Sequence, residues 1–215
     1  MAVDETRPVL KRGERAPGFI LPRTHREGIV SLADYLGRGP RLLGVFRGVS
    51  CAFCRRAIVQ LNLTGDRLQM LGIETLGIVA TVPENARLYF RYRPVRVALA
   101  ADPDLSTHRA YGLPRVQVPW EAFNSRRVNP TGGLPEPLPV WEAVRALSRV
   151  EGFRPTEADR EESQRNWTQS AGEFLIDREE IVRWAFVEYA TGDAAGIGKF
   201  PAAAEILSAA RTLAV

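Results

Sequence analysis

The pattern of hydrophobic and polar positions predicts strands that alternate with helices along most of this chain. An apolar run begins at residue 42 and ends at residue 48, and it has the length of a buried strand. From residue 57 to residue 71, apolar residues recur every three or four positions, which is the spacing of one helix face. Further strand and helix patterns follow at residues 74–111. This order is typical of a parallel α/β core.

One helix start in this region carries a recognisable cap. Thr81 stands three residues before Glu84, and Pro83 lies between them. This spacing predicts a capping box, with the proline in the first helical turn. The helix is expected to end near Tyr92, because Pro94 prevents its extension.

The alternation breaks between residues 114 and 171, which we interpret as an insertion. Six prolines and Gly132–Gly133 exclude regular structure from much of its first half. The apolar positions from Val140 to Val150 then keep helical spacing, and a polar helix is predicted to start at Thr156. An insertion of this length is commonly a lid, a specificity element or an oligomer contact.

The rest of the chain completes one domain, predicted over residues 14–215. Residues 1–13 are polar and without pattern, so we expect a flexible lead-in. After the insertion, residues 174–176 and 181–189 predict an antiparallel hairpin, and residues 201–213 predict an amphipathic helix. A chain of 215 residues is long enough to bury a full core without a stabilising disulfide.

Candidate chemistry is concentrated in the only two cysteines, Cys51 and Cys54, at the start of the first long helix. Residues three apart on a helix are neighbours, so a reversible disulfide is geometrically available. The helix N-terminus favours a thiolate over a thiol, and the cations Arg55 and Arg56 act in the same direction. One of the two thiols is therefore a predicted nucleophile, with Arg55 and Arg56 as candidates for tuning its pKa.

The number of cysteines and the distribution of charge indicate the cellular compartment and the classes of binding partner. A lone pair of close cysteines suits a reducing compartment, and the chain shows neither a signal-peptide pattern nor 18 consecutive apolar residues. We expect a cytoplasmic protein that binds no membrane. The net charge is +4, but basic residues are scattered among acidic ones, so nucleic-acid binding is not expected.

Metal and cofactor binding are not expected either. A structural zinc site needs about four ligands. Besides Cys51 and Cys54, the chain offers only His25 in a predicted turn and His108 in a predicted short helix. We expect His108 to be a surface or capping residue.

Several segments of the chain resemble those of a known protein family. One is Phe46-Arg47-Gly48 before Cys51-Ala52-Phe53-Cys54, and others are residues 16–21, 28–32, 102–104, 110–112, 174–177 and 181–183. They resemble the AhpC/TSA (redoxin) family, the peroxiredoxin-like branch of the thioredoxin-fold superfamily, and the cysteine segment looks like peroxiredoxin-like members that carry a CxxC motif. The resemblance implies an α/β thioredoxin-like fold, with a central mixed sheet flanked by helices, and thiol-dependent redox chemistry.

The two parent patterns imply opposite roles for the thiols. Similarity to thioredoxins makes Cys51 the nucleophile and Cys54 the resolving thiol. Similarity to peroxiredoxins makes Cys54 the peroxidatic residue and Cys51 the resolving one. The peroxidatic families carry a Thr or Ser three residues before the attacking cysteine and an arginine on a late strand, and these places fall here on Cys51 and near Ala171.

Two other residues are candidates for tuning the thiolate. Arg47 stands at the end of the strand that leads to the cysteines, where it could line the site. Glu173 occupies the place where thioredoxins carry their cis-proline, and it could replace that proline or the buried acid that assists proton transfer. Trp120, Trp141 and Trp167 could line a substrate groove, although the aromatic core of a small subdomain is the simpler interpretation.

These observations predict a thiol-disulfide oxidoreductase that works through a reversible Cys51–Cys54 disulfide. Its electron donor would be a dithiol protein or a low-molecular-weight thiol, and a homodimer is possible. One alternative is a thiol-dependent peroxidase that reduces hydrogen peroxide or alkyl hydroperoxides. Another is a redox-inactive protein that keeps the fold and uses the insertion to contact a partner.

Overall fold

A five-stranded mixed sheet forms the centre of the computed structural model, which describes residues 7–190 and 196–213. The strand order is β5-β4-β3-β8-β9, in which β3, β4 and β5 are parallel while β8 and β9 are antiparallel to their neighbours. The strands are β3 (Arg41–Phe46), β4 (Glu74–Val79), β5 (Ala98–Ala101), β8 (Gly172–Ile176) and β9 (Val182–Val187). The predicted mixed sheet and the β8–β9 hairpin are confirmed.

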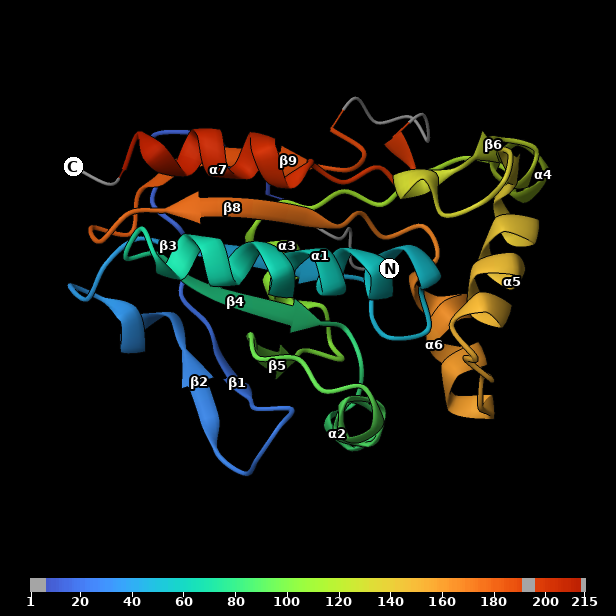
Figure 1. The fold of residues 1–215 in the computed structure, drawn as a ribbon, viewed down its shortest axis with the longest axis horizontal. Helices are drawn as coiled ribbons and strands as arrows, with labels where there is room; N and C mark the ends of the chain where they lie inside the picture. The colour runs from blue at the N-terminus through green and yellow to red at the C-terminus, as the bar shows by residue number, and fades with distance from the viewer. Residues whose placement is uncertain (1–6, 191–195, 214–215) are drawn as a thin grey trace.

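Helices cover both faces of this sheet (Figure 1). One face packs against α1 (Ala52–Gln69), α2 (Pro83–Tyr92) and α7 (Ala203–Arg211). The opposite face packs against the segment around α3 (Ser106–Ala110) and against the N-terminal part of the chain. Every residue of β3 is buried because this strand lies in the middle of the sheet with a core on each face.

The N-terminal part of the chain packs closely on the domain. It contains β1 (Ile20–Pro22), β2 (Ile29–Ser31) and the 3₁₀ helix η1 (Leu32–Tyr35). The expected lead-in differs from the structure over residues 7–13, since Leu10 is buried and its amide donates to the Tyr111 carbonyl at 3.1 Å. An apolar side chain within a polar stretch gives no periodic signal, which is why the sequence pattern missed it. The first six residues lie outside the described part of the chain.

The insertion forms a helical subdomain at one end of the sheet (Figure 1). It contains α4 (Trp120–Asn124), β6 (Arg127–Val128), η2 (Pro130–Gly132), β7 (Leu138–Pro139), α5 (Val140–Val150) and α6 (Glu157–Asn166). The two predicted helices are confirmed as α5 and α6, and the Thr156–Asp159 capping box opens α6. The hydrophobic core of this subdomain includes Ala52 and Phe53, which join it to the start of α1.

The predicted cap at Thr81 is wrong. Helix α2 begins at Pro83 with Val82 as its N-cap, and no side chain caps it. The Thr81 hydroxyl instead accepts a hydrogen bond from the Val49 amide at 3.0 Å. Thr81 thus fixes the loop between β3 and α1 through a contact between residues 32 apart in the sequence.

Among the described helices, none combines the length and the hydropathy needed to cross a membrane.

Candidate active site

The two cysteines lie where β3 passes into α1, at the end of the sheet that the insertion covers. Cys51 is the N-cap of α1, and its sulfur accepts a hydrogen bond from the Cys54 amide at 3.3 Å. Both thiols are free; Cys51 is partly exposed, whereas Cys54 is completely buried. The prediction that both thiols lie at the start of the first long helix is confirmed. The helix N-terminus thereby supports a negative charge on Cys51.

The surroundings move the pKa values of the two thiols in opposite directions. Burial by itself would raise the pKa of Cys51, but the hydrogen bond from the Cys54 side chain and the positive charge of Arg47 outweigh it. The pKa of Cys51 therefore lies well below its usual value. Burial and the neighbouring Cys51 raise the pKa of Cys54 well above its usual value. The pair thus favours a Cys51 thiolate beside a Cys54 thiol.

Arg47 is held beside the thiols by a buried hydrogen-bond network. Its Nη1 and Nη2 atoms donate to the two carboxylate oxygens of Glu188 at 2.5 and 3.0 Å, and both side chains are buried. Nη1 also donates to the Gln169 carbonyl at 2.9 Å and lies 3.1 Å from the Tyr189 hydroxyl. A guanidinium fixed by several acceptors cannot turn away to solvent. The predicted candidate Arg47 is therefore part of the thiol site.

Glu188 is itself satisfied by backbone donors from two other segments. It accepts from the amides of Gly198 at 2.6 Å and Ala171 at 3.2 Å. Burial raises the pKa of this carboxyl group, while the charge of Arg47 opposes the rise. Sequence analysis missed Glu188, although an acidic residue within the apolar run of residues 182–189 was a usable signal, because a buried carboxylate needs a partner.

Helix α6 of the insertion holds the loop that precedes Cys51. The Asn166 side-chain amide donates to the carbonyls of Arg47 and Ala80 at 3.1 and 3.2 Å. Glu162 accepts from the Ser50 amide at 3.0 Å. Gly48 has φ +135°, and a β-carbon on it would lie 2.3 Å from a Glu162 oxygen. Only glycine fits between this helix and the loop, so the insertion fixes the position of Cys51.

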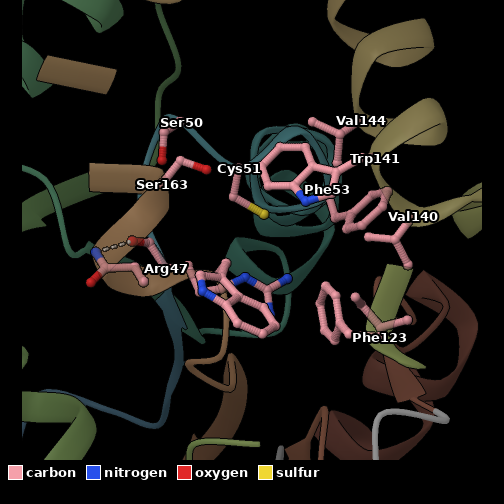
Figure 2. Close-up of a pocket in the computed structure, with 12 residues that line it drawn as sticks. Arg47, Ser50, Cys51, Phe53, Phe123, Val140, Trp141, Val144 and Ser163 are labelled. Carbon is pink, nitrogen blue, oxygen red and sulfur yellow. Dashed lines mark hydrogen bonds between the residues drawn. The ribbon is translucent and has the colours of Figure 1, made fainter. Parts of the chain in front are cut away.

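The Cys51 sulfur opens into a small pocket that the insertion closes on one side. Figure 2 shows the sulfur directed into this pocket, with the rings of Phe53, Phe123 and Trp141 around it. The centres of water-sized molecules can occupy about 40 Å³ of the pocket, which is room for only a few waters. Cys54 is not among the lining residues. A small molecule that enters this pocket meets Cys51 and Arg47.

The adjacent arginines predicted to tune the thiolate point elsewhere. Arg55 is buried, donates to Glu151 at 2.7 Å and to the carbonyls of Val49 and Ser50, and stacks on Phe153. Arg56 lies 3.9 Å from Glu151. Arg55 therefore supports the loop before Cys51 and ties it to α5, rather than contacting a sulfur.

Glu173 is brought to the core and not to the thiol pair. It pairs with Gly44 on β3 and Phe186 on β9, and it is buried. Burial, followed by the negative charge of Glu205, raises its pKa to about 8. Neither cysteine contributes to this shift. Within the described residues, its Oε2 atom has no hydrogen-bond partner.

His108 is also buried, so its expected place at the surface is wrong. Burial lowers its pKa to about 3, and neither ring nitrogen has a hydrogen-bond partner among the described residues. The short helix α3 packs its last turn into the core, which a five-residue pattern could not reveal.

In residues 7–190 and 196–213, no three His, Cys, Asp or Glu side chains gather as a metal site.

Comparison with known proteins places this geometry in a family. The sequence pattern of the AhpC/TSA family matches residues 12–185, from before β1 into β9. The chain belongs to the AhpC/TSA family. Curated protein sequences give no match. The family match covers the cysteine pair, Arg47 and the insertion, and it ends just before Glu188.

Solved structures show the same fold at low sequence identity. Thioredoxin peroxidase I of Plasmodium yoelii is 16% identical with a TM-score of 0.56, over 94% of this chain and 90% of that one. The peroxidoxin BcpB of Mycobacterium tuberculosis is 13% identical with a TM-score of 0.51, over 95% and 96%. The reduced 2-Cys peroxiredoxin of Plasmodium vivax is 16% identical with a TM-score of 0.52, over 82% and 71%. The predicted thioredoxin-like fold is therefore confirmed.

In this AhpC/TSA chain, the arginine beside the thiols is the candidate Arg47. The family resemblance put the arginine place near Ala171 on a late strand, but the buried guanidinium beside the thiols comes from Arg47 at the end of β3. The late part of the chain provides the counter-charge, Glu188, and the Ala171 amide donates to it.

Proposed function

We propose that this protein is a thiol-dependent peroxidase in which Cys51 attacks a hydroperoxide and Cys54 resolves the product as a disulfide. The observation that carries the proposal is the asymmetry of the pair. Cys51 opens to a small pocket beside Arg47, and its pKa is lowered, whereas Cys54 is fully buried and its pKa is raised. The accessible thiolate is the better nucleophile.

The first chemical step is attack of the Cys51 thiolate on the terminal oxygen of a hydroperoxide R–O–OH. The S–O bond forms as the O–O bond breaks, and the departing R–O⁻ takes up a proton and leaves as an alcohol, or as water when the substrate is hydrogen peroxide. Cys51 becomes a sulfenic acid. Arg47, fixed by Glu188, supports the thiolate before attack and faces the oxygen that gains negative charge.

The second step forms the disulfide. Cys54 loses its proton and attacks the Cys51 sulfur, an S–S bond forms, and hydroxide leaves with a proton as water. Two thiols or one dithiol then supply two electrons and two protons to restore both cysteines. The donor class, a dithiol protein or a low-molecular-weight thiol, is part of the proposal. The cytoplasmic location and the homodimer stay predictions.

Thiol-disulfide exchange is a second candidate function. The CxxC spacing with a buried second cysteine favours it, because Cys54 can resolve a mixed disulfide as readily as a sulfenic acid. The narrow pocket favours the peroxidase, since a protein disulfide would have to pass the aromatic side chains of the insertion to reach Cys51.

Stopped-flow fluorescence of the reduced protein separates these functions. We expect hydrogen peroxide and tert-butyl hydroperoxide to oxidise it faster than a small protein disulfide does. Cys51→Ser should abolish the reaction, and Cys54→Ser should stop at a sulfenic acid that dimedone traps. Faster reaction with the disulfide would favour the exchange function. No reaction with any oxidant would favour the redox-inactive interaction protein.

A further inference from the structure

A much larger groove between α5 and α6 borders the pocket at Cys51. The groove holds about 870 Å³. Five residues line both spaces: Ser50, Trp141, Val144, Ser163 and Trp167. A ligand whose reactive end reaches the Cys51 sulfur therefore has room to extend along the groove, which a molecule of the size of hydrogen peroxide leaves unfilled.

Tryptophan side chains form the wall of this groove nearest the thiol. Trp120 lies 5.5 Å from Trp141 and 5.3 Å from Trp167, and Trp167 lies 4.7 Å from Phe123, measured between ring centroids. Trp120 is still 39% exposed, and the indole N–H of Trp141 is buried without an acceptor among the described residues. This wall offers a large apolar contact area for a ligand.

Cations occupy the groove further along α5. Trp141, Arg145 and Arg149 follow one another at four-residue intervals, so they lie on one face of the helix. Arg145 and Arg149 are exposed, and no described carboxylate lies within ion-pair distance of either guanidinium. The groove lining holds three arginines, Arg145, Arg149 and Arg160, and one carboxylate, Asp159, so its net charge is positive.

We propose that the groove selects organic hydroperoxides with an apolar chain and a terminal carboxylate. This inference rests on the proposed peroxidase function. The hydroperoxide group reaches Cys51, the chain lies on Trp120, Trp141 and Trp167, and the carboxylate meets Arg145 and Arg149. The reaction is the one described above, with a hydroxy acid as the alcohol product. The insertion thus acts as the specificity element of the site.

Two measurements on the intact protein test this assignment. The first is binding of decanoate, compared with its neutral amide decanamide, followed by tryptophan fluorescence. The second is stopped-flow oxidation by hydroperoxy-linoleic acid, by its methyl ester and by hydrogen peroxide. Both are made on the wild type and on Arg145→Gln/Arg149→Gln. The matched control is Arg67→Gln/Arg91→Gln, which removes the same charge from exposed positions on α1 and α2.

We expect decanoate to bind more tightly than decanamide and hydroperoxy-linoleic acid to react faster than its ester. In Arg145→Gln/Arg149→Gln, both preferences should fall about threefold to tenfold, while the rate with hydrogen peroxide and the control variant stay unchanged. Equal binding of acid and amide, or preferences unchanged in this variant, would overturn the assignment even if hydrogen peroxide reacts. Failure of every hydroperoxide would refute the peroxidase function and the hydroperoxide as ligand, whereas a decanoate preference that is lost in the variant would still support the groove as a site for an apolar chain with a carboxylate.

Discussion

Arg47 and Glu188 form a buried, bidentate ion pair that joins the end of β3 to the end of β9, with N–O distances of 2.5 and 3.0 Å. The pair lies 141 residues apart in the sequence. Its guanidinium also stabilises the Cys51 thiolate. One positive charge is therefore shared between a structural carboxylate and a reactive sulfur, which couples the stability of the domain to the chemistry of the site.

Removing the charge of Arg47 should raise the pKa of Cys51 and slow its reactions. The suitable variant is Arg47→Gln/Glu188→Gln, because it leaves no unpaired carboxylate in the core. Alkylation by iodoacetamide at pH 7 should slow about tenfold in a Cys54→Ser background. Arg56→Gln is the control and should keep the wild-type rate and pH profile. A slower rate in the control only would restore Arg56 as the tuning residue.

Removing Glu188 alone should destabilise the domain by about 3 kcal/mol, since Arg47 is left buried without its carboxylate. The loss should be larger in a Cys51→Ser background, where no thiolate remains to compensate the guanidinium. Urea unfolding of the four proteins in this double-mutant cycle measures the coupling. Glu157→Gln, which breaks an exposed pair with Arg160, should change stability by less than about 1 kcal/mol. Additive losses would show that Cys51 does not share the charge.

Gly48→Ala should separate steric contact from backbone strain at the loop before Cys51. Gly48 (φ +135°) and Gly28 (φ +106°) both lie beyond the left-handed helical region, but of the two only Gly48 has heavy atoms, those of Glu162 and Thr81, where a β-carbon would lie. We expect a loss of about 3 kcal/mol for Gly48→Ala and about 1 to 2 kcal/mol for Gly28→Ala in urea unfolding. Similar losses in both variants would contradict the role of α6 in holding this loop.

Glu173→Gln should stabilise the protein at neutral pH and leave the thiols unaffected. The pKa of Glu173 is raised from 4.5 to about 8 in the folded state. The folded protein then binds this proton more tightly than the unfolded chain, so wild-type stability falls as the pH rises from about 4.5 to about 8. The advantage of the variant should grow by about 3 kcal/mol between pH 4 and pH 7. A changed alkylation rate at Cys51 would instead return Glu173 to the thiol site.

The hydrophobic pattern of the sequence was sufficient to predict helices and strands that bury one face in the core. It predicted α5 and α6 inside an insertion rich in proline, because Val140, Val144 and Leu147 repeat with helical spacing and Thr156 and Asp159 cap the next helix. It also placed both cysteines at the first turn of α1, since a buried strand leads directly into a periodic segment.

Contacts between distant segments were beyond the local pattern. The spacing of Thr81 fits a capping box. Its hydroxyl instead accepts a hydrogen bond from the Val49 amide in the loop after β3, and α2 has no side-chain cap. Arg55 and Arg56 follow the cysteines directly, but the Arg55 guanidinium binds Glu151 and the carbonyls of Val49 and Ser50, and the Arg56 guanidinium lies 3.9 Å from Glu151. The role of Arg47 depends on Glu188, which lies 141 residues away in the sequence and contacts Arg47 through the tertiary fold.

The assignment of Cys51 as the nucleophile is tested most directly by mapping which sulfur reacts first. Reduced wild-type protein is treated with less than one equivalent of iodoacetamide at pH 6 to 7, and the Cys54→Ser and Cys51→Ser variants are each treated with less than one equivalent of hydrogen peroxide and then dimedone. Peptide mass spectrometry locates and quantifies each label. We predict the iodoacetamide label on Cys51, with Cys54 unmodified in the wild type, and dimedone labelling of Cys54→Ser but not of Cys51→Ser. Preferential alkylation of Cys54, or oxidation of Cys51→Ser at Cys54 at the wild-type rate, would contradict this assignment.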